Sequence, residues 1–396
     1  MNLIFFLRKG VSSLLLFFPP IIALLFLLYS YFWIDHGLVT FLSANRPAIG
    51  YFFKLIEFTG NNKVLMAQIY LALIIIMSIC QLVFFIPRVY KSLSIKPLFF
   101  ILGLIVLIYS LSYPFLSKDI FYYYISAKMA YFYHLNPFNT TPIELAGKDF
   151  FVYISHNIRA PYLYGPLFLV YSIIPMAILG VNKIILYFII LKLLNGILFF
   201  TSGLLLYKLT DFDRRIIAIW FLNPFLLIEW LSNSHNDIVM IAFSIIGFFY
   251  FTKKKNIKSL IFIICSILIK FVSVIITPLL IFKNHQRVHY SKILGITLPI
   301  LIHFTGRAIQ PWYFSWSYML LPFAKLKSIS WIIFFFIGFI QLINYYRFLE
   351  SSGWGAGLII QNPENVINIL IVLILLVEYW NKISKAYCDV IKKTSL

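Results

Sequence analysis

Long apolar stretches separated by short polar segments are the main pattern along this chain. A helix needs about 20 apolar residues to cross the hydrocarbon core of a bilayer, and lipid offers backbone groups no partner outside the helix itself. Each long stretch therefore predicts a membrane helix. Because several stretches are shorter than a full span, we expect about 11–13 membrane segments. The stretches lie at residues 13–34, 64–86, 97–115, 166–180, 184–207, 216–231, 238–252, 259–282, 293–305, 313–324, 329–346 and 364–380.

Basic residues gather in short clusters between these stretches. Cytoplasmic loops carry an excess of Lys and Arg, so these clusters predict a cytoplasmic N-terminus and C-terminus and place residues 116–165 outside. If Lys208, Arg214 and Arg215 are also cytoplasmic, residues 166–207 must cross the membrane an odd number of times. Residues 259–282, which have basic residues at both ends, should form a re-entrant helical hairpin with Lys270 near its apex. One continuous helix over 259–282 is the alternative. The clusters are Arg8-Lys9, Arg88/Lys91/Lys96, Lys253–Lys255 with Lys258, Lys283/Arg287/Lys292, Lys325/Lys327 and Lys382/Lys385/Lys392/Lys393.

Composition supports the same picture and excludes a soluble domain. Of 396 residues, 62% are hydrophobic and 12% are charged, whereas soluble domains have about 25% charged residues. The net charge of +20 is explained by the topology clusters, so we expect no nucleic-acid partner. The first stretch is too long for a signal peptide and predicts an uncleaved span. The predicted fold class is an all-α, polytopic membrane helical bundle that forms one integral membrane domain over residues 1–396.

The predicted outer loop at 116–165 contains the first candidate catalytic residue. Asp119 follows the third apolar stretch directly, at the boundary of water and lipid. A partly desolvated carboxylate at this place can act as a general base for a hydroxyl group. The alternative is that Asp119 only caps the following helix. That helix, Ile120–Leu135, is rich in Tyr and predicts an amphipathic helix lying in the interface.

Three further polar clusters fall on the same predicted side of the membrane. The segment Asn233-Ser234-His235-Asn236-Asp237 separates two apolar stretches, although it could be only a connecting loop. Lys270 lies within an apolar stretch, where a lysine must snorkel, form an ion pair or bind an anion such as phosphate. Arg307 could hold a phosphate with two parallel hydrogen bonds. The neighbouring aromatic residues could stack on a sugar or belong to an interfacial belt; this last segment contains Gln310, Trp312 and Tyr313.

In their order along the chain, these pieces resemble the membrane-embedded glycosyltransferases of the GT-C superfamily. They are most similar to the bacterial polyprenyl-phosphate-mannose-dependent mannosyltransferases, and the similarity runs from about residue 110 to residue 325. Any single piece is a weak signal, while the ordered set is fairly specific for the superfamily. The motifs are Ser117-Lys118-Asp119 with the Tyr-rich helix, Asn136-Pro137-Phe138, Ala160-Pro161-Tyr162, Tyr164-Gly165-Pro166-Leu167, Leu222-Asn223-Pro224, Ser234-His235-Asn236-Asp237, Lys270 and Gln310-Pro311-Trp312-Tyr313.

The resemblance implies a GT-C-like fold and transfer of a hexose, with mannose favoured, from a polyprenyl-phosphate-linked donor to a lipid-linked or cell-envelope glycan. It implies Asp119 as the catalytic base. Some relatives have an Asp-Glu pair where this chain has Asp119-Ile120, so we expect no metal or other cofactor, with a divalent cation left open. The expected setting is the outer face of a bacterial plasma membrane, and the expected partners are the donor, the acceptor and the bilayer. Residues expected to bind substrate are Lys118, Tyr123, Tyr164, His235, Asn236, Asp237, Lys270, Arg307, Gln310, Trp312 and Tyr313.

Two other functions remain open at this stage. The chain could be a lipid-linked saccharide transporter or a polymerase-like channel protein, which would need a polar pathway through the bilayer. Transporters more often have charges near mid-membrane and paired repeats, whereas the spans here are nearly free of charge, with Lys192 and Glu229 as the main exceptions. A structural subunit of a larger complex is the third possibility, and it predicts that the polar clusters tolerate alanine.

Overall fold

The computed structural model has an all-α architecture, as predicted from the sequence. It describes residues 2–44, 46–284, 286–288, 290–291, 293–294, 298, 310–323 and 328–351. Arg307, most of the predicted stretch at 293–305 and all of the stretch at 364–380 lie outside these residues. Within the described part of the chain, the structure contains helices and no strands.

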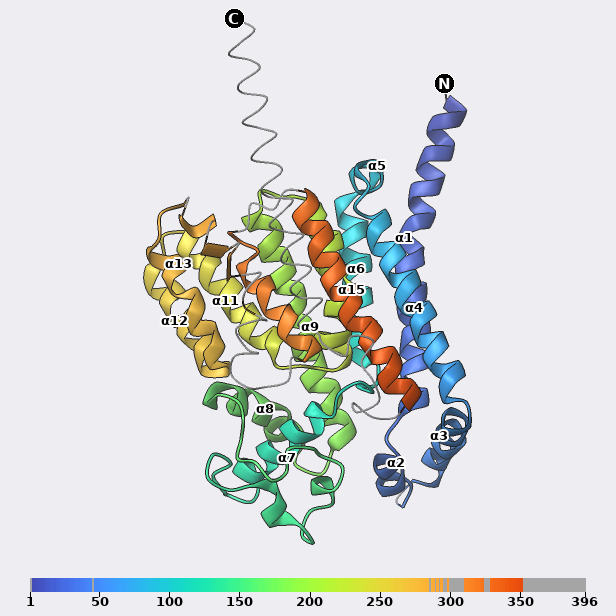
Figure 1. Cartoon of the computed structure of the whole chain (residues 1–396), viewed down its shortest axis with the longest axis vertical. Coiled ribbons are helices and arrows are strands. Elements are labelled where there is room, and N and C mark those ends of the chain that lie inside the picture. The colour runs from blue at the N-terminus through green and yellow to red at the C-terminus, as the bar shows by residue number, and fades with distance from the viewer. Residues whose placement is uncertain are drawn as a thin grey trace, which may run out of the picture.

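The longer helices form the body of the molecule (Figure 1). They are α1 (Asn2–Ser30), α3 (Tyr51–Asn61), α4 (Lys63–Val83), α6 (Ile95–Leu111), α7 (Asp119–Tyr131), α8 (Pro166–Leu179), α9 (Ile184–Leu209), α11 (Asp237–Thr252), α12 (Asn256–Ile269) and α15 (Ser328–Ser351). Shorter helices connect them: η1 (Tyr31–Trp33), α2 (His36–Ser43), η2 (Pro47–Gly50), α5 (Pro87–Ser92), η3 (Pro142–Leu145), η4 (Phe150–Val152), η5 (Ile217–Phe221), α10 (Pro224–Leu226), η6 (Leu227–Ser232), η7 (Phe271–Ile276), α13 (Pro278–Ile281) and η8 (Pro311–Leu320).

Three helical segments among the described residues are long and apolar enough to cross a membrane, namely Leu16–Trp33, α4 and α9. A fourth crossing segment is possible by the same criteria if two helical segments count as one, namely Pro224–Ser232 and Asp237–Thr252. The chain bends by 110° between them. Other apolar helices, including α6, α8 and α12, are shorter than a full span. The chain is therefore a membrane protein.

The long helices pack against one another as a bundle, and the elements of residues 116–165 lie at one end of it. Helix α1 packs on α6 and α4, α6 packs on α9, and α9 packs on α11. Helix α15 packs on α4, and α11 packs on α12. In Figure 1, α2, α3, α7 and α8 lie at the lower end of this bundle, whereas α5 and the beginning of α1 lie at the upper end.

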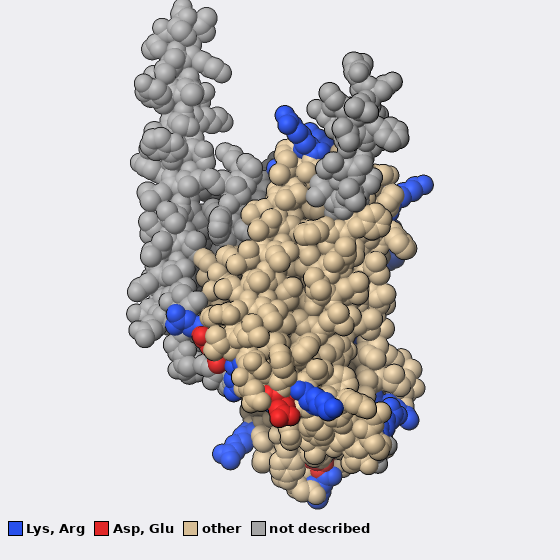
Figure 2. All heavy atoms as spheres, turned by 90° about the vertical axis from the view of Figure 1, so that its right-hand side faces the viewer, with Lys and Arg blue, Asp and Glu red and all other residues tan. Residues whose placement is uncertain are grey.

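On the face shown in Figure 2, charged side chains lie mainly at the two ends of the molecule. On the face shown in Figure 2, a broad uncharged band separates the Lys and Arg residues of the upper end from the charged residues of the lower end. At the upper end, the Arg214 guanidinium donates to the carbonyls of Tyr90 and Leu93, at 2.9 Å each. This contact places two of the basic segments, near residue 90 and near residue 214, at the same end of the bundle.

The helix predicted at Ile120–Leu135 forms, but the expectation that it is amphipathic is wrong. Helix α7 runs from Asp119 to Tyr131, and all its residues from Asp119 to Met129 are buried. Its aromatic rings are packed on all sides by the surrounding loops and by α8, so no exposed polar face remains. Tyr-rich sequences give this pattern because a phenol can bury its ring and still donate from its hydroxyl group.

The segment at 259–282 breaks at Lys270, so the alternative of one continuous helix is wrong. Helix α12 ends at Ile269, Lys270 has an extended backbone (φ −153°, ψ 115°), and η7 begins at Phe271. Whether this broken segment is re-entrant in a bilayer stays a prediction.

The neighbouring loop docks onto this break, because the N–H of Gly165 donates to the carbonyl of Ile269 at 3.0 Å. A Cβ atom at Gly165 would lie 2.0 Å from the Leu268 carbonyl oxygen, so only glycine allows this close approach.

Candidate active site

Asp119 lies at the first position of α7 with its carboxylate buried inside the protein. One carboxylate oxygen, Oδ1, is 2.7 Å from Nε2 of His156, and the other, Oδ2, is 3.1 Å from Nδ1 of His235. The hydroxyl groups of Tyr123 and Tyr164 donate to the same Oδ2 at 3.3 and 3.2 Å. The side chain therefore faces four polar groups, of which Tyr123 lies one turn along α7 and the other three come from other segments, and it does not cap its own helix.

These neighbours decide the charge of the Asp119 carboxylate. Burial by itself would raise its pKa, but the hydrogen bonds and positive charge of His156 and His235 outweigh burial and hold the pKa well below the ordinary value. Burial together with the nearby Asp119 charge raises the pKa of the Tyr123 and Tyr164 phenols far above their ordinary value. Both tyrosines thus stay protonated and can donate to an ionised Asp119.

His235 links Asp119 to a second buried acid. Its Nε2 lies 3.2 Å from Oε2 of Glu229, whose other oxygen accepts a hydrogen bond of 2.8 Å from the Tyr345 hydroxyl. The His235 ring also stacks on Trp312 with 4.6 Å between ring centroids. With a carboxylate on each nitrogen, the ring is held in one orientation.

The bend in the chain between η6 and α11 creates this arrangement. Helix η6 contains Glu229 and ends at Ser232, and α11 begins at Asp237 after the 110° bend. Within the bend, Ser234 has a left-handed backbone with φ of 60°. The amide of Asn195 on α9 donates to the Ser234 hydroxyl at 2.9 Å and anchors it. The break thus turns His235 away from the helix axis and toward Asp119.

A second polar cluster surrounds Lys270. Its ammonium group lies 2.7 Å from Oδ1 of Asp237, and the indole N–H of Trp316 donates to the same oxygen. The ammonium also lies 4.8 Å from the centre of the Trp316 ring and 5.8 Å from that of Tyr164. Since Tyr164 contacts both Lys270 and Asp119, it joins the two clusters into one site.

The structure brings most of the predicted substrate-binding residues together. The Asn236 N–H donates to the Tyr123 hydroxyl at 3.3 Å, and Tyr313 packs against Trp316 with ring centroids 4.9 Å apart. Gln310 lies directly before η8, the helix that carries the aromatic residues. Lys118 is different, because its exposed ammonium pairs with Asp35 at 2.9 Å and not with a member of the site. Residues that meet around the site are Tyr123, Tyr164, His235, Asn236, Asp237, Lys270, Trp312 and Tyr313.

Sequence reasoning missed three members of the site. His156 comes from an irregular loop without periodicity. Glu229 and Tyr345 lie in apolar stretches. The sequence singled out Glu229 only as a charge within an apolar stretch, and it did not single out Tyr345. A cue existed for Glu229, since an acid within an apolar stretch needs a partner. Within the described residues, no group of three or more His, Cys, Asp or Glu side chains is arranged to hold a metal ion.

Comparison with known protein families shows a match over the middle of the chain. A family model described as "Alpha-(1->6)-mannopyranosyltransferase, N-terminal domain" matches residues 54–284, which is more than half of the chain and includes Asp119, His235 and Lys270. No curated protein and no solved structure matches the chain.

Proposed function

Because the chain belongs to the alpha-(1->6)-mannopyranosyltransferase family, we propose that it transfers mannose from a polyprenyl-phosphate-linked donor to a lipid-linked or cell-envelope glycan. The observation that carries this proposal is the buried, ionised Asp119 carboxylate, which lies in one site with the Lys270 ammonium. A base for the acceptor and a cation for the leaving phosphate are the two groups that such a transfer requires.

In the proposed reaction, the acceptor hydroxyl attacks the anomeric carbon of the donor in a single displacement. A new C–O bond forms, the bond between the anomeric carbon and the phosphate oxygen breaks, and polyprenyl phosphate leaves with the electron pair. Asp119 takes the proton of the hydroxyl as the new bond forms. A single displacement inverts the configuration, so a β-linked donor gives an α-mannoside.

The charges of the site fit this sequence of events. The low pKa of Asp119 keeps it ionised, and a nearby carboxylate also stabilises the positive charge that develops on the sugar ring. The Lys270 ammonium stabilises the charge of the departing phosphate. His156, whose side chain is 39% exposed and 2.7 Å from Asp119, offers the proton a route to solvent.

A lipid-linked donor is supported by the surface beside Lys270. Helices α8 and α12 pack together next to Tyr164 and Lys270, and both expose apolar side chains outward. These include Val170 and Ile174 on α8 and Ile264 and Leu268 on α12. A polyprenyl chain lying along these two helices would place its phosphate beside the ammonium.

The proposed setting is the outer face of a bacterial plasma membrane. The site lies at the end of the bundle that holds α7 and α8, opposite the end where Arg214 meets the segment near Tyr90. Basic loops favour the cytoplasmic side, which would leave the site outside.

The test is a donor panel. Purified full-length protein is incubated with polyprenyl-phosphate-linked mannose, glucose, galactose or arabinose and with an α-mannoside acceptor, and donor consumption is measured. We expect consumption of the mannose donor by the wild type and by Asp213→Asn, an acid at the other end of the molecule, but not by Asp119→Asn. Consumption of no donor, or equal consumption by all three proteins, would overturn the proposal.

A further inference from the structure

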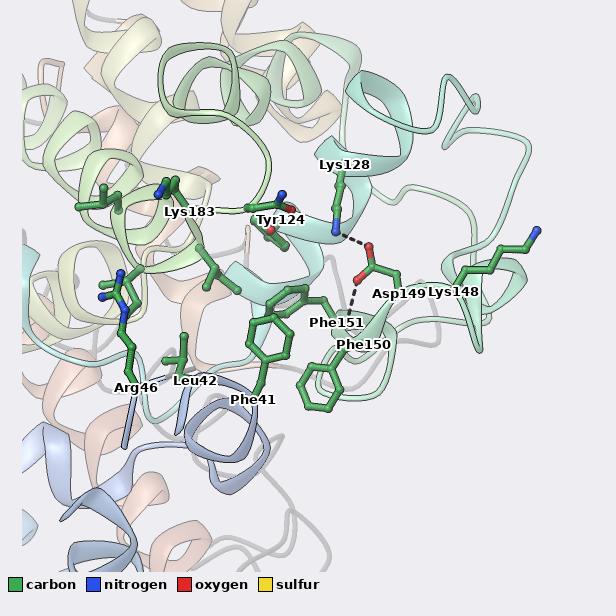
Figure 3. A pocket seen from close by; sticks show the side chains of 14 residues that line it. Phe41, Leu42, Arg46, Tyr124, Lys128, Lys148, Asp149, Phe150, Phe151 and Lys183 are labelled. Atoms are coloured by element: carbon green, nitrogen blue, oxygen red, sulfur yellow. Dashed lines mark hydrogen bonds and ion pairs between the residues drawn. The ribbon is translucent and has the colours of Figure 1, made fainter. Parts of the chain in front are cut away.

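A cavity of about 730 Å³ lies at the same end of the bundle as α7, apart from the Asp119 site. It is lined by α2, the second half of α7, η4 with the loop before it, and the beginning of α9 (Figure 3). Lys128 on α7 lines it, nine residues beyond Asp119, which corresponds to roughly 13 Å along a helix. The cavity therefore belongs to neither the Asp119 cluster nor the Lys270 cluster.

The lining of this cavity has a surplus of positive charge. It contains four cations, Arg46, Lys128, Lys148 and Lys183, and one acid, Asp149. The Asp149 carboxylate forms an ion pair with the Lys128 ammonium at 2.6 Å. Arg46, Lys148 and Lys183 have no ion-pair partner within the described ranges. In Figure 3 Arg46 reaches in from the side opposite Lys128, whereas Lys148 points outward at the rim.

The Lys128 ammonium can bind more than its present partner. Its residue is 8% exposed, and aromatic rings surround it, including Tyr124 at 5.9 Å and Phe151 at 5.7 Å. An ammonium has three N–H donors, and Asp149 is the one acceptor that it contacts in the described part of the protein. Asp149 in turn accepts from the Tyr133 hydroxyl at 3.1 Å and the Phe151 N–H at 3.0 Å, so its own charge is shared among three donors.

The beginning of α9 adds backbone donors to the same cavity. Lys183 precedes this helix without a side-chain cap, and Ile184, Ile185 and Leu186 form its first turn and line the cavity. The first N–H groups of a helix have no partner within the helix and carry partial positive charge, so they favour an anion. Cationic side chains and backbone donors thus converge from two walls.

The position of the cavity favours a membrane lipid as the source of the anion. Helix α9 is one of the membrane-crossing helices, and at its first turn the side chains of Ile185 and Leu186 are 39% and 46% exposed. The cavity therefore lies beside the first turn of a helix that is long and apolar enough to cross a membrane, and the ends of such a helix lie near the lipid headgroups. The stacked rings of Phe41 and Phe150, 5.1 Å apart, give its wall an apolar side.

We propose that this cavity is a binding site for a phosphate monoanion, and that its ligand is the phosphate-bearing headgroup of an anionic membrane lipid. Arg46 and Lys183 bind the phosphate together with the first turn of α9, and Lys128 on the opposite side adds to the positive charge of the cavity. The site goes beyond the proposed transfer reaction, because none of these residues belongs to the Asp119 site.

The test measures binding of three probes to the purified full-length protein by calorimetry: dihexanoyl phosphatidylglycerol, dihexanoyl phosphatidylcholine and glycerol phosphate. We expect the phosphatidylglycerol to bind most tightly. The double variant Arg46→Gln/Lys183→Gln should lower its affinity at least tenfold, and the single variant Lys183→Gln should lower it less. The control Lys253→Gln/Lys254→Gln removes the same charge from exposed residues elsewhere and should leave the affinity unchanged.

Each outcome tests one part of the proposal: the source of the anion, the selectivity for an anion, or the site itself. Equal affinity for glycerol phosphate and phosphatidylglycerol would overturn the lipid source in favour of a soluble phosphate. Equal affinity for phosphatidylcholine would overturn selectivity for an anion, and unchanged affinity in the double variant would overturn the site. Asp119→Asn should bind phosphatidylglycerol as the wild type does, so failure of the transfer reaction and failure of this site are distinguishable.

Discussion

The Nδ1 atom of His235 lies 3.1 Å from a carboxylate oxygen of Asp119, although His235 lies at the 110° bend between η6 and α11 and Asp119 lies at the first position of α7. A contact between such separate segments fixes the position of the carboxylate relative to the membrane helices. It also leaves that carboxylate buried and charged, which is the state that the proposed transfer needs.

Replacement of Asp119 by Asn is expected to lower the rate of mannosyl transfer by about 100- to 10,000-fold, the usual contribution of a general base. Asn keeps the size of the side chain and can still accept hydrogen bonds from Tyr123 and Tyr164. The variant should fold like the wild type, as measured by size-exclusion chromatography and tryptophan fluorescence. A variant with normal turnover would refute the role of Asp119.

Stability should fall at acid pH because of the same carboxylate. The pKa of Asp119 is lower in the folded protein than in the unfolded chain, where it is about 3.9. Between these two values the unfolded chain binds more protons, so stability decreases as the pH falls through this window. Thermal unfolding measured from pH 6 to pH 3 should show a steeper loss for the wild type than for Asp119→Asn. Parallel curves for the two proteins would contradict this account.

Glu229 is expected to act as a positioning residue for His235. The variant Glu229→Gln removes the negative charge 3.2 Å from the imidazole, while its amide oxygen can still accept from the Tyr345 hydroxyl. We expect a lower kcat, by about 10- to 100-fold, with little change in the donor KM, since Glu229 does not touch the proposed substrate. Tyr345→Phe should show a smaller effect in the same direction. A rise in donor KM with unchanged kcat would contradict a positioning role.

The individual parts of this site were predictable from the sequence, but not all of their partners. Asp119, His235 and Lys270 stand out because each interrupts or adjoins an apolar stretch. A polar side chain is costly there unless it has a partner or a function. His156 lies in an irregular loop that has no such contrast, so only the folded chain shows that it contacts Asp119. The all-α fold followed from the apolar stretches, whereas the bend after η6 depends on tertiary packing and left no periodic signal.

Lys270 is expected to bind the donor phosphate. Hydrogen bonds to charged groups contribute about 1.5–3 kcal/mol, so Lys270→Gln should raise the donor KM by roughly 10- to 150-fold, and Lys270→Arg should retain part of the binding. The loss could also come from leaving Asp237 unpaired. The double variant Asp237→Asn/Lys270→Gln separates the two causes, because it removes both charges. If the double variant restores the wild-type KM, Lys270 serves only to pair with Asp237.

Gly165 is expected to control both stability and the distance between the two halves of the site. Its N–H donates to Ile269, and a Cβ would lie 2.0 Å from the Leu268 carbonyl oxygen, which is backbone and cannot turn away. Gly165→Ala should therefore push the Tyr164 loop away from Lys270 and cost about 1–3 kcal/mol or more of stability, as overpacking does. Thermal unfolding and donor KM measure the two effects. Gly50→Ala is the matched control, because a Cβ there would meet nothing within 4 Å. An equal melting temperature for the two variants would show that the loop can move away at no cost, and that this contact does not fix the site.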